Sequence, residues 1–281
     1  GTSDPLVIER AVPLVLGGTE MCATFDEVRS LTALDQRPLD LSNALQTCIY
    51  KASTDGDLAE TARLQLAFLS ALPDDPVAPA VAQGLLESAE ACSLVGDAQA
   101  DPVVMARPGF VADFTYHCAE VAEQAADLEA AIDRYQWSLD NAVDEDHATL
   151  ARDGLARALI NHAEGVGAGE LPEPVPAGGT GRGETDVVVY NDSPEELRIV
   201  LSGPESRIEI IPASTTSETY SMIGPPLCRT DVPSLELRLQ PGEYRALVEA
   251  TSGNVSPFSG DWTLSSGDAY QSCFFIVTSF V

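Results

Sequence analysis

Basic residues are scarce in this sequence. Lysine occurs once, at Lys51, and lysine and arginine together number 15 against 44 aspartate and glutamate residues. The resulting net charge of −29 would repel nucleic acid phosphates and anionic lipid surfaces, so no nucleic acid partner is expected. The same charge attracts cations, so a basic protein or peptide is one candidate partner. The alternative interpretation is a solvated acidic surface that only keeps the chain soluble.

Long hydrophobic runs are also missing. No stretch approaches the ~20 apolar residues of a membrane span, so no span is predicted. No leader peptide is recognisable, and Gly1-Thr2-Ser3 is interpreted as a cloning remnant in place of a native leader. Residues 1–13 are therefore treated as an N-terminal segment outside the fold. The near absence of lysine, with abundant alanine and glycine, is typical of a GC-rich genome, and we expect a bacterial protein.

Catalytic motifs are absent as well. The three histidines, His117, His147 and His162, form no HExxH pair, and none lies in the C-terminal part, where a serine nucleophile would need a base. Neither a phosphate-binding lysine loop nor a dinucleotide fingerprint is present. The sequence therefore predicts a protein that is not an enzyme and has no cofactor. A Cys/His metal site at His117 and Cys118 and a weak calcium site at Asp55-Gly56-Asp57 are minor alternatives.

Cysteines are few but even in number. None forms a CxxC motif, and this pattern favours disulfides over zinc sites. Disulfides persist in oxidising compartments, so we expect a periplasmic or secreted protein. The alternative is a set of reduced, buried thiols. The six cysteines are Cys22, Cys48, Cys92, Cys118, Cys228 and Cys273.

An internal repeat is the strongest pattern in the sequence. Identical residues recur 70 positions apart, without a gap. Chance seldom aligns two cysteines and three dipeptides in one register, so residues 14–163 are interpreted as two copies of one unit, about 14–83 and 84–163. The matching positions are Glu20/Glu90, Cys22/Cys92, Arg37-Pro38/Arg107-Pro108, Cys48/Cys118, Ala52/Ala122, Asp57-Leu58/Asp127-Leu128, Leu69/Leu139, Asp74/Asp144, Ala78/Ala148 and Gly84-Leu85/Gly154-Leu155.

Both copies have the hydrophobic spacing of α-helices. Residues 41–54 carry an apolar stripe at positions i, i+3, i+4 and i+7. Asp57 and Asp127 each precede another such stripe and are candidate N-caps. Further helices are expected over about 77–94 and 146–162.

The segment 127–139 resembles the second helix of a tetratricopeptide repeat. Ala131, Tyr135 and Ser138 stand at the small, aromatic and small positions of that motif. The residues that fit the small position of a first helix are Gly84 and Gly154. The resemblance implies an all-α domain of helical hairpins over residues 14–163, which binds peptides or proteins on a concave face.

The cysteine spacing is the same in both copies. The two cysteines of each copy are 26 residues apart, a helix–loop–helix distance. One bridge per copy would join two neighbouring antiparallel helices and stabilise the fold by roughly 3–4 kcal/mol. The duplication therefore predicts the bridges Cys22–Cys48 and Cys92–Cys118, although sequence alone does not fix the connectivity.

The composition changes after the helical copies. Residues 164–184 are rich in glycine and proline and are predicted to be a linker. In residues 185–281 the hydrophobic period becomes two, and roughly seven short strands predict an antiparallel β-sandwich. The fold class is therefore multidomain α + β. The hairpin Leu239–Tyr244 resembles a segment of PEGA-like and transthyretin-like modules, which implies an accessory domain without chemistry of its own. A Cys228–Cys273 bridge would pin a loop to the last strand.

Three aromatic residues lie late in the β part. Phe258, Trp262 and Tyr270 are possible ligand-binding residues that would stack on sugar rings if they share an exposed face. The alternative places them in the sandwich core. The sequence therefore favours an exported scaffold that binds a protein through its helical repeats. A glycan- or cell-surface-binding protein acting through the β part is the second hypothesis.

Overall fold

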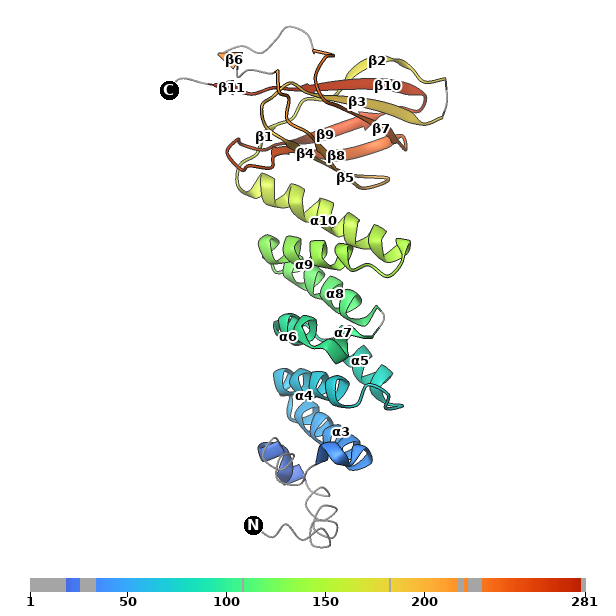
Figure 1. Cartoon of the computed structure of the whole chain (residues 1–281), viewed down its shortest axis with the longest axis vertical. Helices are drawn as coiled ribbons and strands as arrows, with labels where there is room; N and C mark the ends of the chain where they lie inside the picture. The colour runs from blue at the N-terminus through green and yellow to red at the C-terminus, as the bar shows by residue number, and fades with distance from the viewer. Residues whose placement is uncertain are drawn as a thin grey trace. The chain divides into compact units, whose positions relative to one another are not determined.

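The computed structural model describes residues 19–25, 34–107, 109–181, 183–216, 220–221 and 229–278. Helices come first along the chain and β-strands follow, which confirms the predicted order of α and β regions (Figure 1). The described residues divide into two compact units. Unit 1 comprises Gly1–Val121 with Asn141–Val143, and unit 2 comprises Ala122–Asp140 with Asp144–Val281.

Unit 1 is helical in its described residues. Buried leucine, alanine and phenylalanine side chains line one side of α3 and of α4. The apolar stripe predicted over residues 41–54 therefore faces the interior of this unit. The elements are η1 (Thr19–Thr24), η2 (Leu34–Gln36), α3 (Pro38–Asp55), α4 (Leu58–Ala71), α5 (Ala78–Leu86), η3 (Glu90–Leu94), α6 (Val95–Ala100), α7 (Pro102–Met105) and α8 (Phe110–Gln124), whose last residues belong to unit 2.

Two helix ends share the same backbone turn. Gly56 follows α3 with φ +78°, and Ala126, 70 positions later, follows α8 with φ +60°. In each turn the next residue, Asp57 or Asp127, donates its backbone N–H to the carbonyl five residues upstream at 2.9 Å. The same aspartates accept a hydrogen bond from the backbone N–H three residues downstream, at 3.0 and 3.3 Å respectively. Both predicted N-caps are therefore confirmed.

These turns predict opposite effects for reciprocal substitutions. A Cβ atom in the left-handed region costs roughly 1–2 kcal/mol. A Cβ added at Gly56 would meet no atom within 4 Å, so only the backbone conformation matters there. We expect Ala126→Gly to raise the free energy of unfolding by about 1 kcal/mol and Gly56→Ala to lower it by about 1 kcal/mol. Urea denaturation measures both, and changes of the same sign would contradict the shared conformation.

Glycine also sets the approach of neighbouring helices. In unit 2, α9 (Leu128–Asp140) packs on α10 (Glu145–Gly165). A Cβ added at Gly154 of α10 would lie 2.6 Å from Cζ and 2.7 Å from Cδ1 of Tyr135, closer than carbon atoms approach. In unit 1, Gly84 of α5 takes the same place against Gln65 of α4, and Gln65 precedes Tyr135 by 70 positions. The absent side chain lets both helix pairs pack closely.

Two mixed sheets make up the β part of unit 2. The five-stranded sheet has the order β1-β9-β8-β4-β5, and the four-stranded sheet has the order β2-β10-β3-β7. A separate pair joins β6 to β11. The strands are β1 (Gly169–Glu170), β2 (Val175–Gly179), β3 (Thr185–Asn191), β4 (Leu197–Ser202), β5 (Arg207–Ile211), β6 (Tyr220–Ser221), β7 (Ser234–Leu239), β8 (Gly242–Ala250), β9 (Phe258–Leu264), β10 (Asp268–Phe274) and β11 (Val277–Thr278).

The prediction of purely antiparallel strands is wrong. β10 runs parallel to β3, β1 runs parallel to β9, and β11 runs parallel to β6. A tight hairpin makes the two strands that it joins antiparallel neighbours only when both strands lie in the same sheet. β9 and β10 follow one another in the chain but belong to different sheets, so the direction of β10 is set by β3.

One hydrophobic core lies between the two sheets. Its side chains come from both sheets at every second residue, as the pleat of a strand requires. Tyr244 and Trp262 are its largest fully buried members. The core consists of Leu171, Val187, Val189, Leu197, Ile199, Leu201, Ile211, Leu237, Leu239, Tyr244, Ala246, Val248, Ala250, Trp262, Leu264 and Tyr270.

The other face of the five-stranded sheet is covered by α10. This helix contacts β4, β5, β8 and β9. Val200 and Leu247 are cross-strand partners that are fully buried outside the inter-sheet core, so they face this helix. Arg245 of β8 adds polar contacts, because its guanidinium donates to Asn161 Oδ1 at 3.0 Å and to Glu164 Oε2 at 2.8 Å. The last helix therefore belongs to the same compact unit as the sheets.

The segment 164–184 differs from the predicted linker. It contains β1 and β2, which are edge strands of the two sheets. Pro176 is tolerated in β2 because an edge strand leaves one row of N–H groups without a ladder partner. Leu171 is buried in the core, and the Pro172 carbonyl accepts a hydrogen bond from Trp262 Nε1 at 3.1 Å. The segment is thus part of unit 2.

Candidate functional site

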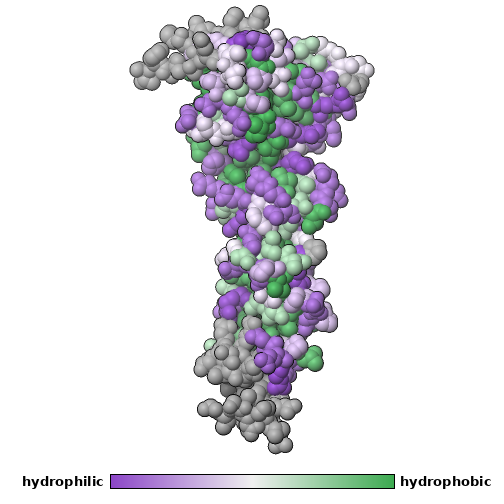
Figure 2. Space-filling view, in the orientation of Figure 1, coloured by the Kyte–Doolittle hydropathy of each residue, from purple (hydrophilic) through white to green (hydrophobic). Residues whose placement is uncertain are grey.

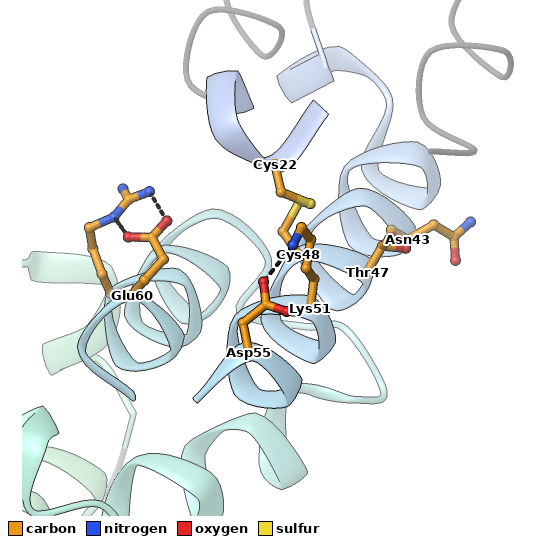
Figure 3. Close-up of a disulfide and its surroundings, with 8 residues drawn as sticks. Cys22, Asn43, Thr47, Cys48, Lys51, Asp55 and Glu60 are labelled. Carbon is orange, nitrogen blue, oxygen red and sulfur yellow. Dashed lines mark hydrogen bonds and ion pairs between the residues drawn. A yellow bond between two sulfur atoms is a disulfide. The ribbon is translucent and has the colours of Figure 1, made fainter. Parts of the chain in front are cut away.

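Two disulfides are the firmest site prediction that the structure confirms. Cys22 bonds to Cys48, and Cys92 bonds to Cys118, with Cα–Cα distances of 5.2 Å in both. Each bridge joins a short 3-10 helix to an α-helix: η1 to α3 (Figure 3) and η3 to α8. The predicted pair of antiparallel α-helices is therefore replaced by a 3-10 helix held against one long helix. Each bridge therefore ties its 3-10 helix to the middle of the long helix.

The surface of α3 opposite its buried stripe is the candidate contact site. We call Leu39, Asn43, Thr47, Tyr50 and Thr54 the α3 face. Leu39 is 79% exposed and Tyr50 is 74% exposed, on a helix whose Leu41, Leu45 and Cys48 are buried. Residues 4, 7 and 11 apart lie on one side of an α-helix, so these five side chains form one line. Figure 2 shows hydrophobic and hydrophilic residues interspersed on the surface of the helical part.

Polar groups of the α3 face are partly satisfied within the helix. The Thr47 hydroxyl donates to the Asn43 carbonyl, and the Thr54 hydroxyl donates to the Tyr50 carbonyl, both at 2.8 Å. The Asn43 amide points away from the helix into solvent (Figure 3). The line therefore offers two large apolar side chains and one outward amide. Sequence reasoning identified the buried stripe of α3 but did not name these residues, although the same periodicity places them opposite it.

Charged residues near the end of α3 and in the first turns of α4 are paired. Lys51 Nζ lies 2.5 Å from Asp55 Oδ2, and Arg63 makes a two-point contact with Glu60 at 2.7 and 2.8 Å (Figure 3). Asp57 caps α4 through its carboxylate. Both carboxylates of the predicted Asp55-Gly56-Asp57 calcium site are thus engaged with protein groups.

Metal ligation has no support in the part of the chain that the structure describes. No group of three or more His, Cys, Asp or Glu residues there is arranged to hold a metal ion. His117 lies beside Cys118, but Cys118 is bonded to Cys92 and does not offer a thiolate. The Nε2 atom of His117 is buried without a hydrogen-bond partner. A single imidazole does not make a metal site.

A serine–histidine pair lies between α9 and α10. Ser138 Oγ and His147 Nε2 are 2.8 Å apart. Such a pair is the beginning of a nucleophilic triad, but Ser138 is 0% exposed and His147 is 8% exposed. Asp144 accepts a hydrogen bond from the His147 backbone N–H at 2.8 Å and caps α10. The pair therefore joins two helices, and a substrate cannot reach the hydroxyl. Sequence spacing did not indicate it.

A second polar cluster connects three helices in unit 2. Arg157 of α10 donates to both carboxylate oxygens of Glu123 at 2.7 and 2.8 Å. The Tyr135 hydroxyl donates to Glu123 Oε2 at 2.9 Å. The hydrogen bonds from Arg157 hold the pKa of Glu123 below its usual value, against the opposing effect of burial. The residues 70 positions earlier are Ser53, Gln65 and Glu87, so the repeat gave no signal for this cluster.

The lowered pKa of Glu123 predicts a pH-dependent stability. The pKa of Glu123 in the folded state lies below the unfolded value of about 4.3. Its carboxylate therefore adds to the free energy of unfolding above that pH, and this stabilisation is lost as pH falls through the folded-state pKa. Arg157 is 44% exposed, so we expect only about 1 kcal/mol. The Glu123→Gln variant should therefore have a free energy of unfolding about 1 kcal/mol below that of the wild type at neutral pH, and the two should be equally stable near pH 3. Urea midpoints across this range test it, with the exposed Glu129→Gln as control. A constant difference at all pH values would contradict it.

The three predicted ligand-binding aromatic residues do not share an exposed face. Trp262 is 0% exposed and Tyr270 is 7% exposed, and both belong to the core between the sheets. Phe258 is 43% exposed and covers Gly169 of β1. Trp262 lies in β9 and Tyr270 in β10, which are strands of different sheets. The structure therefore places two of them in the core and leaves no stacking platform from the three.

The third predicted bridge involves Cys228, which lies outside the described residues. Its neighbour Arg229 lies 3.6 Å from the buried Asp192 carboxylate, measured from Nη1 to Oδ1. The Asp192 backbone N–H donates to the Phe274 carbonyl at 2.8 Å, and Phe274 is next to Cys273. These contacts bring Arg229, which follows Cys228, and Phe274, which follows Cys273, into one region. Cys228–Cys273 stays a prediction that this arrangement favours.

Comparison with known proteins gives no relative. No protein-family model, curated protein or solved structure matches the chain. Among the described residues no helix is both long and apolar enough to cross a membrane.

Proposed function

We propose that the chain is an exported bacterial scaffold that binds a protein or peptide through the α3 face and catalyses no reaction. The exposure of Leu39 and Tyr50 on a bridged helix carries the proposal. Large apolar side chains on a rigid element are the usual anchors of protein interfaces, and tyrosine is enriched among them. The net charge of −29 favours a basic partner. The buried Ser138–His147 pair is not a candidate catalytic site, because no substrate reaches its hydroxyl.

We also infer that the helical part is a duplicated, tetratricopeptide-like repeat followed by a PEGA-like β-sandwich. Helix starts support the duplication, because α4 and α9 begin 70 positions apart, at Leu58 and Leu128. The bridges, the left-handed turns and the close-packing glycines follow the same offset. The single core between two sheets supports the sandwich.

Export is inferred from the cysteines. Two bridges are formed, and cytosolic reductants would keep such thiols reduced. If Cys228 and Cys273 also pair, the denatured, unreduced protein will give no thiol reaction, and reduction will release all six. Two free thiols before reduction would contradict only the third bridge. Six free thiols before reduction would contradict the inference of export.

Single substitutions in the full chain test the α3 face. Leu39→Ala and Tyr50→Ala remove side chains that support no core, so folding is retained. Affinity capture from cells that produce the protein, quantified by mass spectrometry, is expected to lose the partner at least ~10-fold with either variant. Leu150→Ala, at an α10 side chain 54% exposed, is the matched control and should capture normally. Equal capture by all three variants would refute the α3 face as the site.

A further inference from the structure

One edge of the four-stranded sheet is complementary to itself. β7 lies at the end of this sheet and pairs only with β3 in the described part of the chain (Figure 1). It has six residues, Ser-Leu-Glu-Leu-Arg-Leu, with no proline and no bulge in its pairing with β3. Edge strands of this kind are usually shortened, kinked or covered, because their free backbone groups recruit another strand.

The backbone groups that face outward can be assigned. The Asn191 N–H donates to the Pro233 carbonyl at 2.9 Å, which fixes the alternation of the antiparallel ladder. Leu235, Leu237 and Leu239 therefore direct their N–H and C=O groups to β3. The groups of Ser234, Glu236 and Arg238 point away from β3, toward the open edge. Their side chains are exposed, whereas Leu237 and Leu239 are buried in the core.

We propose that two copies of this chain associate through antiparallel pairing of their β7 strands about a two-fold axis at Leu237. In that register Glu236 of each copy lies opposite Arg238 of the other, and each pair exchanges two main-chain hydrogen bonds. The two four-stranded sheets join into one, and half-buried Leu235 gains apolar neighbours.

Charge selects this register over its neighbours. The two β7 strands form main-chain hydrogen bonds only in registers that place outward-facing residues of one copy opposite outward-facing residues of the other. An axis at Glu236 would place the two Glu236 side chains opposite each other, and an axis at Arg238 would do the same with two arginines. Like charges directly opposite destabilise a strand pair, whereas opposite charges stabilise it. The axis at Leu237 is therefore the register in which both charged positions are complementary.

Arg238 lies on the outer face of the sheet, where its side chain is largely exposed. Its Nε lies 3.4 Å from Glu184 Oε2 and 3.8 Å from Asp186 Oδ1 on the outer side of β3, and its side chain is 58% exposed. Acidic neighbours thus hold the guanidinium on the outer face, with capacity for another carboxylate, because it carries five donors. Glu236 is exposed and lies opposite Val188, which offers it no charge.

Charge reversal in single chains tests the pairing. Sedimentation equilibrium of the full chain at about 0.15 M salt, which screens repulsion between the acidic chains, should detect a dimer. Glu236→Arg places arginines opposite each other, and Arg238→Glu places glutamates opposite each other. Each variant alone should raise the dimer dissociation constant at least ~10-fold. Glu209→Arg, on the edge strand of the other sheet, is the control and should dimerise like the wild type.

Mixing the two variants gives the decisive result. In a heterodimer of one Glu236→Arg chain and one Arg238→Glu chain, both opposed pairs again have opposite charges. The equimolar mixture should therefore form heterodimers, which native mass spectrometry distinguishes from either homodimer. Circular dichroism verifies that each variant is folded. If Arg238→Glu does not fold, Glu236→Pro replaces it as the test. This variant lacks one outward backbone N–H and must be monomeric. A monomeric wild type, dimers that survive Glu236→Arg, or a mixture without heterodimers would each overturn the proposal.

Discussion

Trp262→Ala is expected to lower the free energy of unfolding of unit 2 by about 4 kcal/mol. The indole is 0% exposed, is one of the largest members of the core between the sheets, and donates from Nε1 to the Pro172 carbonyl. Its removal leaves a cavity and an unpaired carbonyl on the edge segment that carries β1. Urea denaturation followed by far-ultraviolet circular dichroism measures the loss.

Phe258→Ala is the matched control for this substitution. Phe258 lies on the same strand, β9, but is 43% exposed, so we expect a loss of only about 1 kcal/mol. A small loss for Trp262→Ala, together with weakened binding to glycan arrays, would contradict its structural role and restore the sugar-binding hypothesis.

Gly154→Ala is expected to destabilise unit 2 by about 2–3 kcal/mol, even though alanine favours helices by ~1 kcal/mol over glycine. The added Cβ would lie 2.6 Å from Tyr135 Cζ. The ring is fully buried, and its hydroxyl is bonded to Glu123, so it cannot move aside without breaking that bond. Thermal and urea unfolding should both show the loss.

Gly84→Ala separates close packing from the repeat position itself. The new Cβ would meet only the terminal amide of Gln65, a half-exposed and flexible side chain that can turn away. We expect a change within about 0.5 kcal/mol, or a slight gain in stability from helix propensity. If both glycine substitutions cost the same, the rigid Tyr135 ring is not the cause of the loss at Gly154.

The helical part was the more predictable half from sequence. Each pattern there is local or exactly repeated: the apolar stripe over 41–54, the caps at Asp57 and Asp127, and the cysteine pairs at a common spacing. Such signals depend on residues within one or two helices. The 3-10 helix η1 was not predicted, because so short a segment has no measurable periodicity. The segment of η3 was predicted as the end of one helix over about 77–94, but α5 ends at Leu86 and η3 is a separate 3-10 helix.

The β part and the sites were less predictable, because they depend on contacts distant in sequence. Strands and turns were recognisable from alternation, but the parallel pairing of β10 with β3 follows from which sheet each strand joins. The Glu123–Arg157 contact spans 34 residues and has no counterpart in the first copy. The exposure of Trp262 was ambiguous for the same reason, since alternation alone does not say which face of a strand is covered.

Helix α10 has a consequence for how the chain can be divided. One side of it packs on α9, and the other covers Val200 and Leu247 of the five-stranded sheet. A fragment that starts at Thr185 would keep most strands, yet it would lack β1 and β2 and present that apolar pair to water. The smallest autonomous piece of the C-terminal part therefore begins near Ala122, so the repeat boundary in the sequence and the folding boundary in space do not coincide.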